Sequence, residues 1–307
     1  MMRHPSPRCG FALMTVLWVL TVAALIAATA AARGRAAVSA TRNRAELERA
    51  HWAALTCASE MRASIDDALS APTSPIERAD AWRMLRQAVP DAHTENCSAS
   101  LEAAGTRLDV NSASSEMLDS LFTNLGYGDE SHAMSAALVD WRDSDDVALP
   151  DGAEREWYAS QHRTLPRNGP IVDLRELRRV RGFENANGLD SALSVDAGRV
   201  SLATASVPVL MAVPGIPGEV ADVLVARRDA GTPVRDILAV LPDVSSPSAL
   251  TIETHYSEIV RLTTADPEAW ILRARGWSGE PRNLALIAWR LVRADNRAVV
   301  VAGHDGI

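Results

Sequence analysis

The chain contains no lysine, so arginine supplies all 31 of its basic side chains. With 39 acidic residues the formal net charge is −8, and this lack of basic excess argues against a general nucleic-acid binder, which needs a basic face. Three cysteines are too few for a disulfide scaffold and show no paired metal spacing. Nucleophile-elbow, phosphate-loop and His-Glu-x-x-His motifs are also missing, and the seven histidines are scattered. The sequence therefore predicts a protein that is not an enzyme.

One long apolar run stands near the N-terminus. Residues 11–32 carry no charge, and their only polar groups are three threonines. As a helix this run would be about 33 Å long, enough to cross a bilayer core of about 30 Å. A buried core helix is the alternative. The run predicts a transmembrane helix at 11–32. The whole length of 307 residues allows about two folded domains.

The ten residues before this run are short, basic and end in glycine. A secretory signal peptide would carry its cleavage site after the apolar stretch, where only Ala30–Ala32 offers one. The junction of Gly10 with Phe11 instead resembles the class III leader of type IV pilins and pseudopilins. That resemblance implies a leader at residues 1–10, cut after Gly10 by a prepilin peptidase that also methylates Phe11. It places the N-terminus in the cytoplasm and the main domain in the periplasm, anchored in a bacterial inner membrane.

Two features qualify this resemblance. Two arginines, Arg3 and Arg8, precede the run, and four follow it: Arg33, Arg35, Arg42 and Arg44. This distribution does not match the usual excess of positive charge on the cytoplasmic side of a membrane helix. Pilins and most pseudopilins carry glutamate at the fifth mature position, where it pairs with the N-terminal ammonium of a neighbour. Here that position is Thr15, whose hydroxyl cannot neutralise an ammonium.

Beyond the run, the patterning predicts an α+β fold. An apolar stripe predicts a helix over Ala36–Leu69, and a shorter helix is expected over Glu77–Ala88. Period-two segments Cys97–Leu101 and Arg107–Val110 predict a hairpin about residues 103–105. Short helices separated by glycine and proline turns follow, and the chain then returns to three strands, expected at Ala269–Gly276, Leu284–Val292 and Ala298–Val301.

The simplest architecture is a long N-terminal helix packed on an antiparallel sheet that is interrupted by a large all-α insertion. We expect a periplasmic αβ domain beginning at 33–110, an inserted helical domain with helix-hairpin-helix or SAM-like units at 111–250, and the remaining strands at 251–307.

An acidic segment lies within the predicted insertion. Residues 140–158 hold seven acids and two arginines. Carboxylates at this density repel one another unless a cation neutralises them, and hard oxygen ligands favour calcium or magnesium. Counted from Asp143 as one, Asp145, Asp151 and Glu154 take positions three, nine and twelve of an EF-hand loop, but position six is Ala148 where glycine is required. A solvated acidic loop is the alternative.

The same segment resembles the signature of the type II secretion system protein K family. The shared residues are Asp-Trp-x-Asp-x-Asp-Asp at 140–146, then Gly152-Ala153-Glu154 and Tyr158, with matching motifs at 109–113, 168–170, 174–177 and 180–183. Members of that family also lack the glutamate at the fifth position, so Thr15 fits the pattern.

This resemblance implies a minor pseudopilin that sits with two partners, proteins I and J, at the tip of a periplasmic pseudopilus and supports protein secretion. It also implies calcium binding. We assign the metal chiefly to Asp143, Asp145 and Glu154, and secondarily to Asp140, Asp146 and Asp151.

Other functions remain open at this point. A type IV pilus or competence minor pilin would share the leader. A helix-hairpin-helix DNA-binding membrane protein is a further alternative, because residues 111–141 and 202–241 resemble such units. In the second, however, Pro217 lacks an N–H donor and three acids flank Arg227 and Arg228, so nucleic-acid binding is not expected.

The cysteines allow one structural prediction. Removal of the leader takes Cys9 away and leaves an even pair in an oxidising compartment. We therefore predict a disulfide between Cys57 and Cys97, with two buried free thiols as the alternative.

Overall fold

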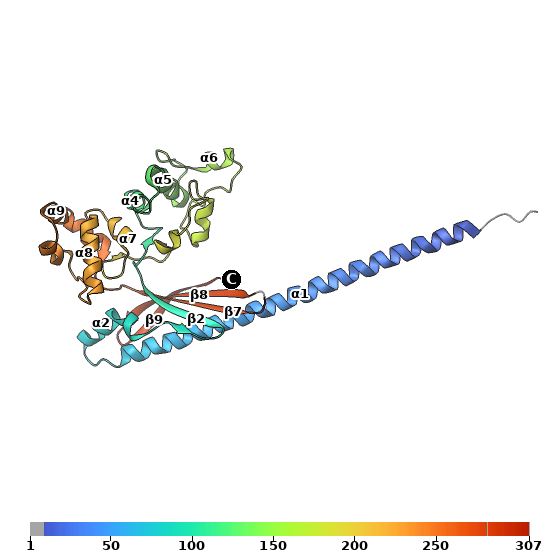
Figure 1. Cartoon of the computed structure of the whole chain (residues 1–307), viewed down its shortest axis with the longest axis horizontal. Coiled ribbons are helices and arrows are strands. Elements are labelled where there is room, and N and C mark those ends of the chain that lie inside the picture. Colours follow the sequence, from blue (N-terminus) through green and yellow to red (C-terminus); the bar gives the residue numbers. More distant parts are fainter. Residues whose placement is uncertain (1–8, 281, 307) are drawn as a thin grey trace, which may run out of the picture.

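A computed structural model describes residues 9–280 and 282–306. Its most extended element is helix α1, Cys9–Ser70, which contains the predicted helix over 36–69. The N-terminal half of α1 projects alone from the rest of the molecule (Figure 1). An 18-residue window of this helix has a mean hydropathy of 2.2 and is 0% buried, which is consistent with a single membrane span. Residues 1–8 of the predicted leader lie outside the described residues, and at the predicted cleavage site, Gly10 and Phe11, only the helical backbone is described.

The C-terminal half of α1 packs against a five-stranded antiparallel sheet of order β1-β2-β7-β8-β9. The strands are β1 Ala92–His93, β2 Cys97–Ala103, β7 Trp270–Ser278, β8 Asn283–Ala294 and β9 Arg297–Gly306. The three strands predicted near the C-terminus are confirmed. Their period-two pattern arises because Leu272 and Ala274 alternate with residues that face away from α1.

The contact between α1 and the sheet is close and covalently linked. A Cβ added at Gly276 of β7 would lie 2.0 Å from the carbonyl oxygen of Ala50, so only glycine allows this approach. Cys57 of α1 and Cys97 of β2 form a disulfide with their Cα atoms 6.2 Å apart. Apolar side chains such as Met61, Ile65 and Leu272 fill the space between helix and sheet.

A short helical segment closes the end of this core. Helix α2, Pro75–Arg83, starts with a capping box in which Ser74 and Glu77 exchange hydrogen bonds. It is followed by α3, Leu85–Ala88. The single helix predicted over Glu77–Ala88 is therefore divided at Met84.

The predicted hairpin about residues 103–105 is wrong. Strand β2 pairs with β7, which returns after the insertion, and β3, Leu108–Asp109, pairs in parallel with β4, Leu193–Ser194. Seven residue pairs align between β2 and β7, and this ladder places Leu101 opposite Leu272 over the face of α1. Pairing with the two-residue strand β3 would bury much less apolar surface.

The chain between β2 and β7 forms the helical insertion. Its α-helices are α4 Ser115–Asn124, α5 Ser131–Arg142, α6 Arg155–Ser160, α7 Val207–Met211, α8 Gly218–Asp229 and α9 Ser246–Leu262. They surround a separate apolar core that includes Phe122, Trp141 and Leu210. Ile259 belongs to this core, so the packing of the insertion continues past residue 250, where we expected it to end.

The insertion lies on the side of the sheet opposite α1 (Figure 1). Arg273 of β7 makes hydrogen-bonded ion pairs with Glu102 of β2 and with Asp196 of the insertion. Arg107 at the start of the insertion also pairs with Glu102. Charge-assisted hydrogen bonds of this kind fix the orientation of the insertion on the sheet.

Candidate metal centre

The candidate site forms where α5 ends. Asp140 lies in the last turn of α5 and is 0% exposed, while Asp143 follows as the C-cap residue of the helix. Glu154, at 4% exposed, is the N-cap residue of α6 at the far end of the intervening loop. One carboxylate oxygen from each of these three residues can be chosen so that all lie within 4.8 Å of one another. The fold therefore gathers three acids from two helix ends.

The loop between the helices is shaped around Asp140. The Asp140 carboxylate accepts a hydrogen bond from the backbone N–H of Leu149, with N···O distances of 3.1 and 3.2 Å. A Cβ added at Gly152 would lie 2.0 Å from Asp140 Oδ2, so this position has room only for glycine. The preceding residue, Asp151, has φ 62° and turns the chain back toward α6.

Several oxygen atoms at this site are buried without a hydrogen-bond partner. They are Asp143 Oδ1, both carboxylate oxygens of Glu154, and Asn168 Oδ1. The Asn168 amide nitrogen donates to the backbone oxygen of Asp145 at 2.8 Å and to Asp146 Oδ1 at 3.1 Å, which places Asn168 against the same loop. Buried oxygens without partners are costly unless a cation coordinates them.

The electrostatics agree with this geometry. Burial, together with the negative charges of Asp140 and Asp143, raises the pKa of the Glu154 carboxyl to about 7. Burial also raises the pKa of Asp143, with Asp145 and Asp140 adding to the effect, and it raises the pKa of Asp140. These shifts show that the ionised carboxylates lack sufficient positive charge nearby. A cation that prefers oxygen ligands would supply that positive charge.

The six acids predicted as metal ligands are thus divided. Asp140, Asp143 and Glu154 come together, and Asp140 is more central than its secondary ranking implied. Asp145, Asp146 and Asp151 are exposed and lie outside this group. Asp145 Oδ1 accepts a hydrogen bond from the backbone N–H of Val147, and Asp146 is 3.6 Å from Arg155. Asn168 was predicted only as part of the motif at 168–170, and its contact with the acidic loop is visible only in the folded chain.

Two buried aromatic side chains, one on α5 and one on α6, pack together beside the acidic residues. Trp141 and Tyr158 meet edge to face with ring centroids 5.2 Å apart, and both are almost completely buried. Trp141 donates its indole N–H to Glu176 at 3.0 Å, and the Tyr158 hydroxyl accepts the backbone N–H of Arg181 at 2.9 Å. These contacts hold α5 and α6, the two helices whose ends carry the acids, against one another.

The donor set fits a hard divalent cation. Three carboxylates and an amide oxygen are the ligand types that calcium accepts, and the described cluster contains neither sulfur nor imidazole. Bound there, calcium would neutralise the carboxylates and link the end of α5 to the start of α6.

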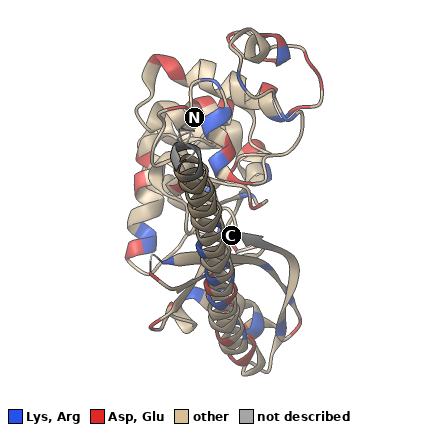
Figure 2. Ribbon diagram, turned by 90° about the vertical axis from the view of Figure 1, so that its right-hand side faces the viewer, with Lys and Arg blue, Asp and Glu red and all other residues tan. Residues whose placement is uncertain are grey.

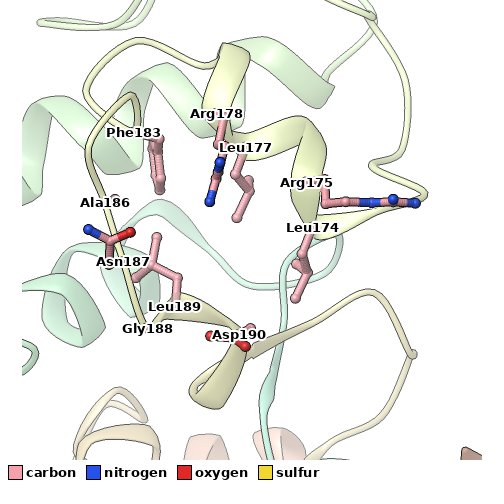
Figure 3. A pocket seen from close by; sticks show the side chains of 10 residues that line it. All are labelled: Leu174, Arg175, Leu177, Arg178, Phe183, Ala186, Asn187, Gly188, Leu189 and Asp190. Atoms are coloured by element: carbon pink, nitrogen blue, oxygen red, sulfur yellow. The ribbon is translucent and has the colours of Figure 1, made fainter. Parts of the chain in front are cut away.

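A separate pocket of about 240 Å³ lies elsewhere in the insertion (Figure 3). Leu177, Phe183 and Leu189 point toward one another inside it, while the Arg175 side chain points away. The ten lining residues include no serine, cysteine or histidine, so this lining offers no nucleophile–base pair.

The two stretches that resemble helix-hairpin-helix units, at 111–141 and 202–241, make packing contacts within the insertion. Gly215, with φ 87°, lies against α9, where an added Cβ would be 2.4 Å from the Cβ of His255. Glu219 of α8 accepts hydrogen bonds from Ser245 and Ser248. In the other stretch, the turn between α4 and α5 carries Asp129 and Glu130, which would repel a phosphate.

Comparison with solved structures finds a chain with a similar fold. The chain is similar to a chain in the crystal structure of the GspK-GspI-GspJ complex from the type 2 secretion system of enterotoxigenic Escherichia coli. The TM-score is 0.58 at 17% identity, and the likeness covers 87% of this chain and 99% of that chain. The two share a fold in which a helical insertion is carried on an α-helix and antiparallel sheet.

A family model matches part of the chain. Residues 95–188, which include the acidic cluster, match the model of the family described as type II secretion system (T2SS), protein K. Over this segment the chain is similar to members of this family. None of the curated proteins matches it.

Proposed function

We propose that this chain is a minor pseudopilin at the tip of a type II secretion pseudopilus, where it helps to initiate or cap the fibre. The observation that carries this proposal is the placement of the insertion. It covers the side of the sheet opposite α1 and is joined to it by the ion pairs of Arg273 (Figure 1). A tightly wound fibre of small subunits has no space for such a mass along its shaft, whereas the tip does.

The fifth mature position supports the same location. Thr15 stands where most pseudopilins use a carboxylate to neutralise the N-terminal ammonium of the neighbouring subunit. That ion pair is strong in the low dielectric of lipid, and threonine cannot replace it. A subunit at the tip has no neighbour above it and does not need the carboxylate.

The proposed partners are the counterparts of proteins I and J. The solved chain with the similar fold was crystallised in a complex with GspI and GspJ. We extend that assembly to this chain, together with processing by a prepilin peptidase between Gly10 and Phe11. N-terminal sequencing of the mature protein should begin at Phe11, and a start at Met1 or after Ala32 would contradict this processing.

Calcium is the proposed ligand of Asp140, Asp143 and Glu154, with Asn168 Oδ1 as a fourth donor. The support is the set of buried oxygens without hydrogen-bond partners and the raised pKa values of the three acids. Bound calcium would hold the α5–α6 loop in one conformation. The role is structural, in keeping with a family of pseudopilins that are generally not enzymes.

Locating the tagged protein on isolated fibres tests the proposal. We expect label at one end of each fibre and loss of secretion when the gene is deleted. A Thr15→Glu variant restores the carboxylate at the fifth mature position, and it should appear along the shaft only if the insertion leaves room for it there. Thr21→Glu is the control for an added carboxylate elsewhere in the same helix. Label along the shaft of the unmodified protein contradicts the tip location. Absence from fibres, with secretion still dependent on the gene, would favour a regulator that stays in the membrane. Dependence of pilus assembly or DNA uptake on the gene would instead favour a type IV pilus role.

A further inference from the structure

Four arginines immediately after the apolar run have no part in the function proposed above. Arg33, Arg35, Arg42 and Arg44 all lie on α1 and are exposed. No acidic residue occurs between Phe11 and Glu46. Seen from the end in Figure 2, α1 carries no charged residues along its described N-terminal portion, and its charges begin beyond the apolar run. This segment is therefore purely basic where α1 would leave a membrane.

The nearest carboxylate is already engaged with the sheet. Glu46 Oε1 accepts a hydrogen bond from Arg49 at 2.6 Å, and Glu46 Oε2 accepts one from the Ser278 hydroxyl at 2.5 Å. The charge of Arg42 contributes only the last of the effects that lower the pKa of Glu46. The chain itself thus supplies little compensation for the four arginines.

Their depth matches the headgroup region of a bilayer. A rise of 1.5 Å per residue places Arg33 and Arg35 within about 5 Å of the end of the apolar run. The headgroup layer is about 5–8 Å thick on each side of the hydrocarbon core. Arg42 and Arg44 stand about 15–18 Å beyond the run, which is within roughly one or two Debye lengths of the lipid surface.

Their angular positions favour a surface that surrounds the helix. Successive residues turn by about 100°, so Arg33 and Arg44 share one side of α1, and Arg35 and Arg42 share the nearly opposite side. An acidic patch on one partner protein would contact only one of these sides. Lipid headgroups contact a helix from all directions.

We propose that Arg33 and Arg35 bind the phosphates of anionic phospholipid headgroups where α1 leaves the membrane, while Arg42 and Arg44 extend the attraction above the surface. The inference rests on the membrane anchorage in the proposed function. Guanidinium groups bind phosphate through paired hydrogen bonds, which favours arginine for this role. These contacts would set the depth of the helix, and withdrawing the helix from the membrane would require breaking them.

Lipid-selective quenching tests the proposal on the full chain in vesicles. In a Trp18→Phe, Ala27→Trp background, the tryptophan at position 27 is the single one within the apolar run, close to its arginine end. Vesicles contain equal amounts of phosphatidylglycerol and phosphatidylcholine, with the acyl chains of one or the other brominated. We expect brominated phosphatidylglycerol to quench more strongly, with a relative affinity of roughly fivefold for each contacting arginine at low salt.

Arg33→Gln with Arg35→Gln should remove most of the preference for phosphatidylglycerol, because glutamine preserves helix propensity and removes the charge, while Arg42 and Arg44 leave only a weaker attraction. Arg178→Gln is the matched control, since this exposed arginine lies in the insertion. Equal quenching in the parent, or a preference that the double substitution leaves undiminished, overturns the proposal. The first result would leave an acidic partner protein as the better explanation of the arginines. Absence of quenching by either lipid would instead show that the helix is not in the bilayer, and the proposed anchorage itself would fail.

Discussion

Gly152 and Asp140 approach so closely that an added Cβ at position 152 would lie 2.0 Å from Asp140 Oδ2 and 3.0 Å from the carbonyl oxygen of Leu149. The glycine does not bind a ligand, but it allows the loop to close over the carboxylate. The candidate metal centre therefore depends on a residue without a side chain as much as on its acids.

Gly152→Ala should accordingly weaken metal binding. The added methyl group must displace the Asp140 carboxylate or the loop, and we expect calcium affinity to fall by about tenfold or more. Isothermal titration with calcium measures the change. Gly169→Ala is the matched control, because the nearest atom to its Cβ would be 3.9 Å away. Equal affinities for the two variants would contradict the role of the Asp140–Gly152 contact.

Glu154→Gln should have opposite effects with and without calcium. Without the ion, the substitution removes a buried carboxylate whose ionised form is disfavoured, so the Tm should rise by about 2–4 °C. With calcium, the variant should lose most of the stabilisation that the ion gives the parent. Thermal unfolding with calcium and with chelator measures both. Asp151→Asn, which alters an exposed acid in the same loop, should behave like the parent, and a parent Tm that calcium leaves unchanged would contradict the metal assignment.

The pH dependence of stability should reverse when calcium is removed. The pKa of Glu154 is raised from 4.5 to about 7 in the folded chain, so between these values the folded state binds more protons than the unfolded state. Without calcium, stability should therefore fall as pH rises from about 5 to 8. With calcium, protons compete with the ion, and the stabilisation by calcium should grow over the same range. Unfolding curves that are flat in pH under chelation would argue against the raised pKa.

The sequence predicted the elements of the pseudopilin-like domain well because each has a strong local pattern. The stripe of α1 and the alternation in β7, β8 and β9 require only neighbours along the chain. The hairpin failed because β2 pairs with β7, which follows after the whole insertion, and no local pattern reports a partner so distant. For the same reason the end of the insertion, set by the packing of Ile259, was placed too early.

The site shows a similar limit. Charge density located the acidic loop, but EF-hand spacing ranked Asp145 above Asp140. The burial of Asp140 results from its place on the inner side of α5, and its contact with Leu149 depends on the path of the loop. Spacing along a loop does not determine which carboxylates face inward. Asn168 reaches the acidic loop from beyond α6, so its contact with Asp145 could be found only once the chain was folded.

The disulfide makes a separate prediction about stability. Cys57 and Cys97 are separated by 40 residues, and in the chain-entropy model a bridge of this length contributes about 4 kcal/mol, with smaller measured gains common. Replacing both cysteines with serine should lower the Tm by several degrees. Thiol labelling of the unreduced, denatured mature protein should detect no free thiol. Two free thiols per chain would show that the bridge does not form in the cell.

Terbium luminescence tests most directly whether Asp140, Asp143 and Glu154 form a calcium site. Terbium accepts the same hard oxygen ligands, and Trp141, between Asp140 and Arg142 in the chain, is close enough to sensitise its emission. We predict saturable emission on excitation of tryptophan, displacement by calcium, and loss of the signal in an Asp143→Asn, Glu154→Gln variant but not in Asp151→Asn. Emission that is absent, or that persists unchanged in the double variant, would contradict the assignment of the metal to these acids.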